Sequence, residues 1–327
     1  MVGATIGRFG AVAPIPSAWR YYVVGILAAA RRDVRLVTLA TLCGVAVFTT
    51  VSMFWLWQAG NAWASDALTY RAGALAFLAG VDPWSAGHAG WSFAGLPVTV
   101  ILFVPGALVP QPVFVGAWQA LTIASAIVIV QRLHLQWWWL LYPPLTIGVI
   151  LGNPAIAGLA GLLAGLPVIG LVLRPHLVVS ARWRSVAVFG ALVVVSFALM
   201  PTYLSLYTTI MARYAVESGA PVNLWASPGM VVAAVALALL ATVDRRAAAW
   251  LVVPATGPSI GWYGFTMIMP LASLPLAVAT SLPIHGLGAW AIVGYALVRF
   301  LSAHATFRLR RWVTVLPSVH TSATRRG

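Results

Sequence analysis

Long apolar runs alternate with short polar intervals along this chain. A helix that crosses a bilayer needs about 20 consecutive apolar residues, and the first such run covers residues 36–57. Further apolar runs predict spans at 113–130, 137–151, 155–173, 186–203, 230–243, 247–260, 265–281 and 287–301. This pattern predicts an all-α, polytopic membrane protein.

The longest polar interval, residues 58–95, follows the first predicted span. Ser65 offers a helix N-cap, and Asp66 lies where a helix dipole favours an anion. Apolar residues then recur at helical spacing, which predicts a helix lying on the membrane surface, at Leu68, Ala72, Leu75 and Leu78. Gly80 is expected to end this helix, and Asp82-Pro83 to form a turn.

A second surface-lying or half-inserted helix is predicted at 97–109, where Pro105 interrupts an apolar run. A second outer interval follows the 186–203 run and covers residues 204–228. It contains Arg213, Glu217 and Asn223. Outer-face surface segments are therefore expected beside the spans.

Composition supports a membrane environment. The chain is 61% hydrophobic and 7% charged, with a mean hydropathy of +0.95, whereas soluble domains are about 25% charged. The net charge is +14, and all nineteen basic residues are arginine. They gather in short clusters beside apolar runs, which is typical of cytoplasmic loops rather than of a nucleic-acid-binding surface.

These clusters orient the predicted spans. Arg31, Arg32 and Arg35 put the start of the first span in the cytoplasm, so that residues 58–95 lie outside. Counting onward puts Arg174 near the inner side and the last arginine cluster outside, against the positive-inside rule. We therefore expect eight to ten spans, with a cytoplasmic segment at 1–35, a transmembrane domain at 36–303 and a basic tail at 304–327.

Acidic residues are scarce, and their positions narrow the candidate chemistry. Asp33 and Asp244 adjoin arginines at predicted cytoplasmic span ends, which favours local charge pairing. Asp66, Asp82 and Glu217 lie in the outer intervals. Position alone leaves Asp66 open between a catalytic carboxylate and a helix-start carboxylate, favours a turn role for Asp82, and leaves Glu217 undecided.

No cofactor or metal site is predicted. The six histidines are scattered without metal-ligand spacing, and the phosphate-binding pattern GxxxxGK[ST] does not occur.

Two short stretches resemble a known family. Ser65-Asp66-Ala67-Leu68-Thr69-Tyr70-Arg71 and Gly80-Val81-Asp82-Pro83-Trp84, followed by the proline-bracketed segment 97–110, are similar to the polytopic GT-C glycosyltransferases of family 87. The resemblance implies a GT-C-like fold in the plasma membrane. It also implies transfer of mannose or arabinofuranose, with mannose favoured, from a polyprenyl-phosphate donor to an envelope glycolipid or glycan of actinobacteria on the outer face, with Asp66 as the general base.

Weaker matches extend the resemblance. Gly152-Asn153 stands where the family has Gly-Gln, Arg174-Pro175-His176 where it has Lys-Pro-Gln, and Trp262-Tyr263 where it has His-Tyr. The segment from Asn223 to Ser227 resembles its Asn-x-Ser. Together with the charged residues of the outer intervals, these matches give the candidate substrate-binding residues Tyr70, Arg71, Asp82, Arg174, His176, Arg213, Glu217, Asn223 and Tyr263.

Two other classes of function remain open from the sequence. A transporter or flippase of lipid-linked or small-molecule substrates is expected to carry ionisable groups or broken helices at mid-membrane and an inverted repeat. A non-catalytic membrane assembly protein is expected not to depend on Asp66.

Overall fold

The computed structural model describes residues 39, 43, 63–88, 91–217, 224, 227–257, 262–282, 284 and 286–315, without the side chains of 91–92, 210–217 and 305–315. Chain contacts divide the protein into units 1–41 and 42–327, and every element below belongs to the second. Leu39 and Cys43 are helical. The rest of the predicted 36–57 span lies outside the described residues.

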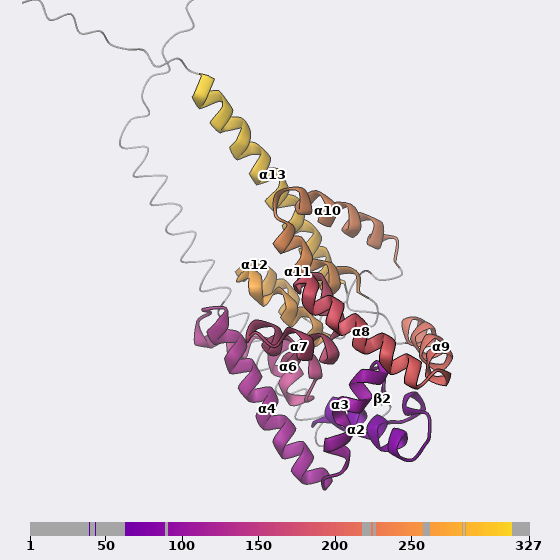
Figure 1. The fold of residues 1–327 in the computed structure, drawn as a ribbon. Coiled ribbons are helices and arrows are strands. Elements are labelled where there is room, and N and C mark those ends of the chain that lie inside the picture. The colour runs from indigo at the N-terminus through magenta and orange to yellow at the C-terminus, as the bar shows by residue number, and fades with distance from the viewer. Residues whose placement is uncertain are drawn as a thin grey trace, which may run out of the picture. The chain divides into compact units, whose positions relative to one another are not determined.

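The described residues are mostly helical, as the sequence predicts (Figure 1). A two-residue hairpin pairs β1 (Gly87–His88) with β2 (Trp91–Ser92). The remaining elements are α2 (Ser65–Leu78), η1 (Pro83–Ser85), α3 (Pro97–Ala107), α4 (Gln111–Arg132), η2 (Trp137–Leu141), α5 (Pro143–Ile150), α6 (Pro154–Leu163), α7 (Pro167–Leu173), η3 (Pro175–Ser180), α8 (Trp183–Leu199), α9 (Thr202–Glu217), α10 (Gly229–Val243), α11 (Arg245–Thr256), η4 (Trp262–Leu271), α12 (Leu274–Ser281) and α13 (Leu287–Val315).

Two helices of the described residues are long and apolar enough to cross a membrane: α4 and the Leu287–His304 part of α13. Two bent pairs raise the number to four if each pair counts as one span. They are α5 with α6, bent by 116°, and α8 with the start of α9, bent by 111°. The span predicted at 113–130 is thus a single helix, while the total of eight to ten stays a prediction.

The prediction of one span at 155–173 is wrong. This run forms two short helices, α6 and α7, which pack against each other. Gly165 turns the chain at a φ of +89°, and Pro167 starts α7. A Cβ on Gly170 would lie 2.7 Å from the Gly158 carbonyl oxygen, so close packing requires glycine there. Apolar composition alone does not distinguish this hairpin from a span.

Proline accompanies other breaks in the predicted spans. The 137–151 run contains η2 and then α5, which starts at Pro143. Pro201 lies between α8 and α9, and Pro270 lies in η4, so the 265–281 run is η4 followed by α12. Proline lacks the backbone N–H that continues a helix ladder. These segments are shorter than the continuous helices that their hydropathy suggested.

The start of α2 differs from the prediction. Ala64, not Ser65, takes the N-cap position, with a φ of +57° and no side-chain cap. The buried face consists of small residues, while Leu75 and Leu78 of the predicted apolar stripe are exposed. Gly80 follows the helix end at a φ of +71°, as expected. Burial of the small-residue face allows close approach to neighbouring helices.

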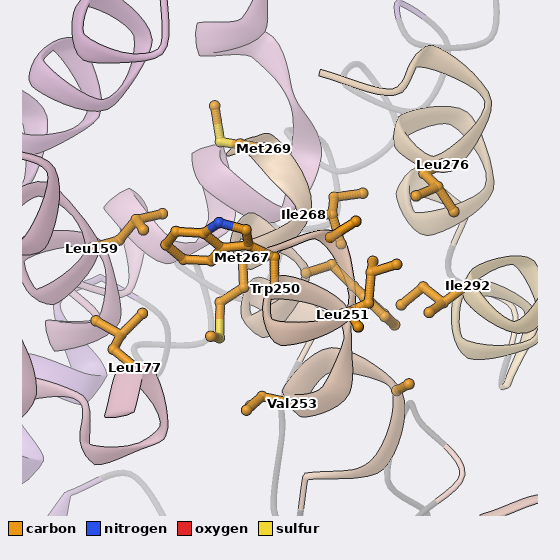
Figure 2. Packing of buried hydrophobic residues seen from close by; sticks show 14 of the residues in the cluster. Leu159, Leu177, Trp250, Leu251, Val253, Met267, Ile268, Met269, Leu276 and Ile292 are labelled. Carbon is orange, nitrogen blue, oxygen red and sulfur yellow. The ribbon is translucent and has the colours of Figure 1, made fainter. Parts of the chain in front are cut away.

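The largest hydrophobic cluster joins segments that are distant in sequence. Figure 2 shows Leu159 of α6, Leu177 of η3, Trp250 of α11, Ile268 of η4 and Ile292 of α13 among its members. All five side chains are buried. This packing fixes η3 and η4, two short 3-10 elements that carry candidate site residues.

Candidate functional site

The candidate site lies at the break between α5 and α6, where the start of α2 reaches it. The Ala64 N–H donates to the Ile150 carbonyl, and the Asp66 N–H donates to the Leu151 carbonyl, both at 3.0 Å. Gly152 occupies the break at a φ of +64°. The first N–H groups of α2 are therefore satisfied by the last carbonyls of α5 rather than by a side-chain cap.

Helix α4 holds the same break from another side. The Trp118 indole Nε1–H donates to the Gly152 carbonyl at 2.7 Å, and the Gln119 Nε2–H donates to the Ile150 carbonyl at 3.1 Å. Gln119 is buried. These bonds fix a piece of irregular backbone next to a helix that is long enough to cross a membrane.

Asn153 connects Asp66 to α6. Its Nδ2 donates to the Asp66 Oδ2 at 2.5 Å, and its Oδ1 accepts a hydrogen bond from the Ala155 N–H at 2.8 Å. Asn153 is the N-cap of α6 and is buried. Both ends of the amide are therefore in use, which fixes the orientation of the amide toward the carboxylate.

Burial raises the pKa of the Asp66 carboxyl from 3.8 to about 6. The Asn153 hydrogen bond and the positive charge of Arg174 both oppose this rise. A carboxylate with such a pKa is mostly ionised at neutral pH and still binds a proton within the physiological range. This is the property expected of a general base.

Arg174 directly follows α7 and reaches the site through the α6–α7 hairpin. Its charge acts on Asp66, so the two side chains lie near each other, whereas the predicted topology put Asp66 outside and Arg174 near the inner side. Its Cζ lies 6.0 Å from the centroid of the Tyr263 ring. A Cβ on Gly158 would lie 3.1 Å from the Arg174 Cβ, so a glycine lets the two segments approach.

The guanidinium nitrogens Nε and Nη2 of Arg174 are buried without a hydrogen-bond partner. The same holds for His176 Nδ1 and Ser180 Oγ, and these four are the buried, unpartnered side-chain atoms of the described residues. All four belong to residues 174–180. An arginine with uncommitted buried donors suits an anionic group such as phosphate.

His176 is held in its neutral form. Burial and the charge of Arg174 lower its pKa to about 3. At neutral pH the imidazole therefore adds a hydrogen-bonding group but no charge.

Tyr263 comes from η4, which packs against α5. A Cβ on Gly148 would lie 3.4 Å from the Tyr263 Cβ, so the tyrosine backbone lies close to α5. Asp66, Asn153, Arg174, His176 and Tyr263 thus form one connected group, which we call the Asp66 cluster.

Three other sequence candidates have separate contacts. Tyr70 packs between Phe93 and Phe103, with ring centroids 5.2 and 4.9 Å away. Arg71 donates from Nη2 to the Val109 carbonyl at 2.9 Å and from Nε to the Gly106 carbonyl at 3.2 Å. These bonds satisfy carbonyls at the end of α3.

Asp82 accepts a hydrogen bond from the Trp84 N–H at 2.9 Å and caps η1, as the turn prediction expects. Arg213 and Glu217 lie in α9, but their side chains are outside the described part, as is Asn223 altogether. Their substrate-binding roles stay predictions.

The sequence analysis did not identify Trp118 and Gln119 as supports of the site. A usable signal existed for Gln119, because an amide inside an apolar helix needs a hydrogen-bonding partner. No such signal marked Trp118 among the sixteen tryptophans of the chain.

Within the described ranges, no three His, Cys, Asp or Glu side chains gather as a metal site. Comparisons of the chain with known protein families, with curated proteins and with solved structures found no match. The geometry of the Asp66 cluster and the short motifs of the sequence are therefore the basis for a functional assignment.

Proposed function

We propose that the protein is an inverting glycosyltransferase that uses a polyprenyl-phosphate sugar, with Asp66 as the general base. The observation that carries this proposal is the pairing of two groups at the α5–α6 break. One is a buried carboxylate whose pKa is raised to about 6, and the other is an arginine with buried, unpartnered donors whose charge acts on that carboxylate. The motif resemblance around Asp66 supports the same assignment.

The proposed reaction has one proton acceptor and one anion-binding group. Asp66 accepts the proton of an acceptor hydroxyl while that oxygen forms a bond to the anomeric carbon of the donor sugar. The bond from this carbon to the phosphate oxygen breaks, and its electron pair leaves on the phosphate. Arg174 donates hydrogen bonds to the departing phosphate. A phosphate leaving group needs no second carboxylic acid.

The site is proposed to face the outside of the plasma membrane. Support comes from the arginine cluster before residues 36–57 and from the apolar helices α4 and α13. Mannose is the favoured sugar and an envelope glycolipid or glycan the favoured acceptor, both on the resemblance alone.

The direct test is sugar transfer in membranes that contain the expressed chain. Radiolabelled polyprenyl-phosphate mannose and polyprenyl-phosphate arabinose are supplied in parallel, and Asp66→Asn is compared with the unchanged protein. A lost base is expected to lower turnover by about 10²–10⁴-fold. Asp33→Asn, which removes a carboxylate beside Arg31 and Arg32, serves as the matched control.

Near-normal transfer by a well-expressed Asp66→Asn protein would end the assignment of the base. Absence of transfer from both donors by the unchanged protein, in membranes where the chain is correctly folded, would overturn the proposed reaction.

A further inference from the structure

A groove of about 500 Å³ lies along α10 and α11, and Val179 of η3 also lines it. Its α10 wall consists of residues at one-turn spacing, including Ala234, Ala238 and Ala241. Its α11 wall includes Ala248 and Ala249, one turn beyond Arg245. The alanines explain the groove, because residues three and four apart share a helix face and short side chains leave that face hollow.

The walls of this groove, which we call the α10–α11 groove, are almost free of available polar groups. Thr256 also lines it, but its hydroxyl already donates to the Val252 carbonyl at 2.7 Å. Val231, Val232 and Val235 of α10 are apolar and exposed as well. A hydrocarbon chain needs no hydrogen-bond partner and fits such walls, whereas a peptide backbone needs partners.

Arg245 gives one end of the groove a positive charge. It is the first residue of α11, it is exposed, and it lines the groove. The neighbouring acid does not neutralise it: Asp244 Oδ2 accepts from Arg299 at 2.8 Å, and Asp244 Oδ1 accepts from the Ala247 N–H at 2.9 Å. The charge of Arg245 is thus available to an anion.

We infer that the α10–α11 groove binds an anionic phospholipid, with one acyl chain along the alanine walls and the phosphate on Arg245. The apolar length and the charge at one end match the two parts of such a lipid. This inference is independent of the proposed glycosyl transfer, since it uses none of the residues of the Asp66 cluster.

The test uses the full chain reconstituted into phosphatidylcholine nanodiscs. Phosphatidylglycerol and phosphatidylcholine, spin-labelled at the same acyl position, are added separately, and the motionally restricted fraction is measured. The unchanged protein is expected to restrict more phosphatidylglycerol than phosphatidylcholine. Arg245→Gln should lower this preference about fivefold, the effect of about one basic residue near an anionic lipid surface.

A second variant tests the groove itself. Ala238 is exposed, so Ala238→Phe fills the groove without entering the core and should reduce the restricted phosphatidylglycerol. Two controls match these changes: Arg246→Gln removes an exposed neighbouring charge, and Val235→Phe enlarges an exposed residue of α10 outside the groove. Both controls should bind as the unchanged protein does.

Equal restriction of the two lipids by the unchanged protein would overturn the inference. If Arg246→Gln and Arg245→Gln lowered the preference for phosphatidylglycerol equally, the inference would also be overturned. The attraction would then come from the general positive charge of this region and not from Arg245 in the groove. If Ala238→Phe fails to fold, the comparison of the two arginine variants still decides the outcome.

Discussion

The side-chain amide of Asn153 donates a hydrogen bond to Asp66 at 2.5 Å while the same amide caps α6. One residue therefore links the orientation of a carboxylate to the start of a helix. The two roles use different atoms, Nδ2 for the carboxylate and Oδ1 for the Ala155 N–H, so a substitution can separate them.

Asn153→Ser should separate these roles. Serine caps a helix about as well as asparagine, but it is too short to replace the amide donor to Asp66. Because this hydrogen bond lowers the Asp66 pKa, its loss should raise that pKa above about 6. The pH dependence of transfer should then shift to higher pH while helix content is retained. An unchanged midpoint would show that Asn153 does not tune Asp66.

Asp66→Asn should stabilise the fold at high pH. The folded-state pKa of about 6 lies above the ordinary value of 3.8, so the stability linked to Asp66 is present below pH 3.8 and is lost as pH rises through 6. The loss amounts to about 3 kcal/mol at pH 8. In thermal unfolding in detergent from pH 4 to pH 8, the midpoint of Asp66→Asn should therefore rise relative to that of the unchanged protein as pH rises. A constant difference would contradict the raised pKa.

Arg174→Gln should have two effects. Loss of the guanidinium removes a donor to the proposed phosphate, so the donor KM should rise. Loss of its charge should also raise the Asp66 pKa, because that charge lowers it. Arg184→Gln, at an exposed arginine beside Trp183, is the matched control and should change neither quantity. An unchanged donor KM in Arg174→Gln would contradict the proposal that Arg174 binds the donor phosphate.

Gly170→Ala should loosen the α6–α7 hairpin. The new Cβ would lie 2.7 Å from the Gly158 carbonyl oxygen and 3.0 Å from the Leu162 nitrogen, and both are backbone atoms that cannot rotate away. Overpacking of this kind costs about 1–3 kcal/mol. Gly190→Ala in α8 meets nothing within 4 Å and should stabilise by about 0.5–1 kcal/mol. Thermal midpoints of the two variants should move in opposite directions.

Local signals in the sequence predicted local structure well. The apolar run of α4, the end of α2 before Gly80 and the turn at Asp82 all depend on neighbouring residues, and all three are found. The prediction that Ser65 caps α2 was wrong, because N–H groups at the start of this helix donate to the carbonyls of Ile150 and Leu151 at the end of α5 instead. No property of residues 64–66 alone determines that partner.

The α6–α7 hairpin marks the other limit. Its sequence is an apolar run as long as a span, and the distinction depends on glycine faces that pack together only in three dimensions. A single span at 155–173 put Arg174 near the inner side, whereas the hairpin brings Arg174 near Asp66. The short motifs named Asp66, Arg174, His176 and Tyr263 as separate candidates, but only the folded hairpin brings Arg174 to the carboxylate.

The distance along the chain between Asp66 and Asn153, 87 residues, has a consequence for biosynthesis. A ribosome adds about 5–20 residues per second, so Asp66 emerges roughly 4–17 s before its hydrogen-bonding partner does. During this interval the carboxylate has neither Asn153 nor Arg174 beside it. The two interactions that lower the Asp66 pKa in the folded protein are therefore missing from a nascent chain that stops before residue 153.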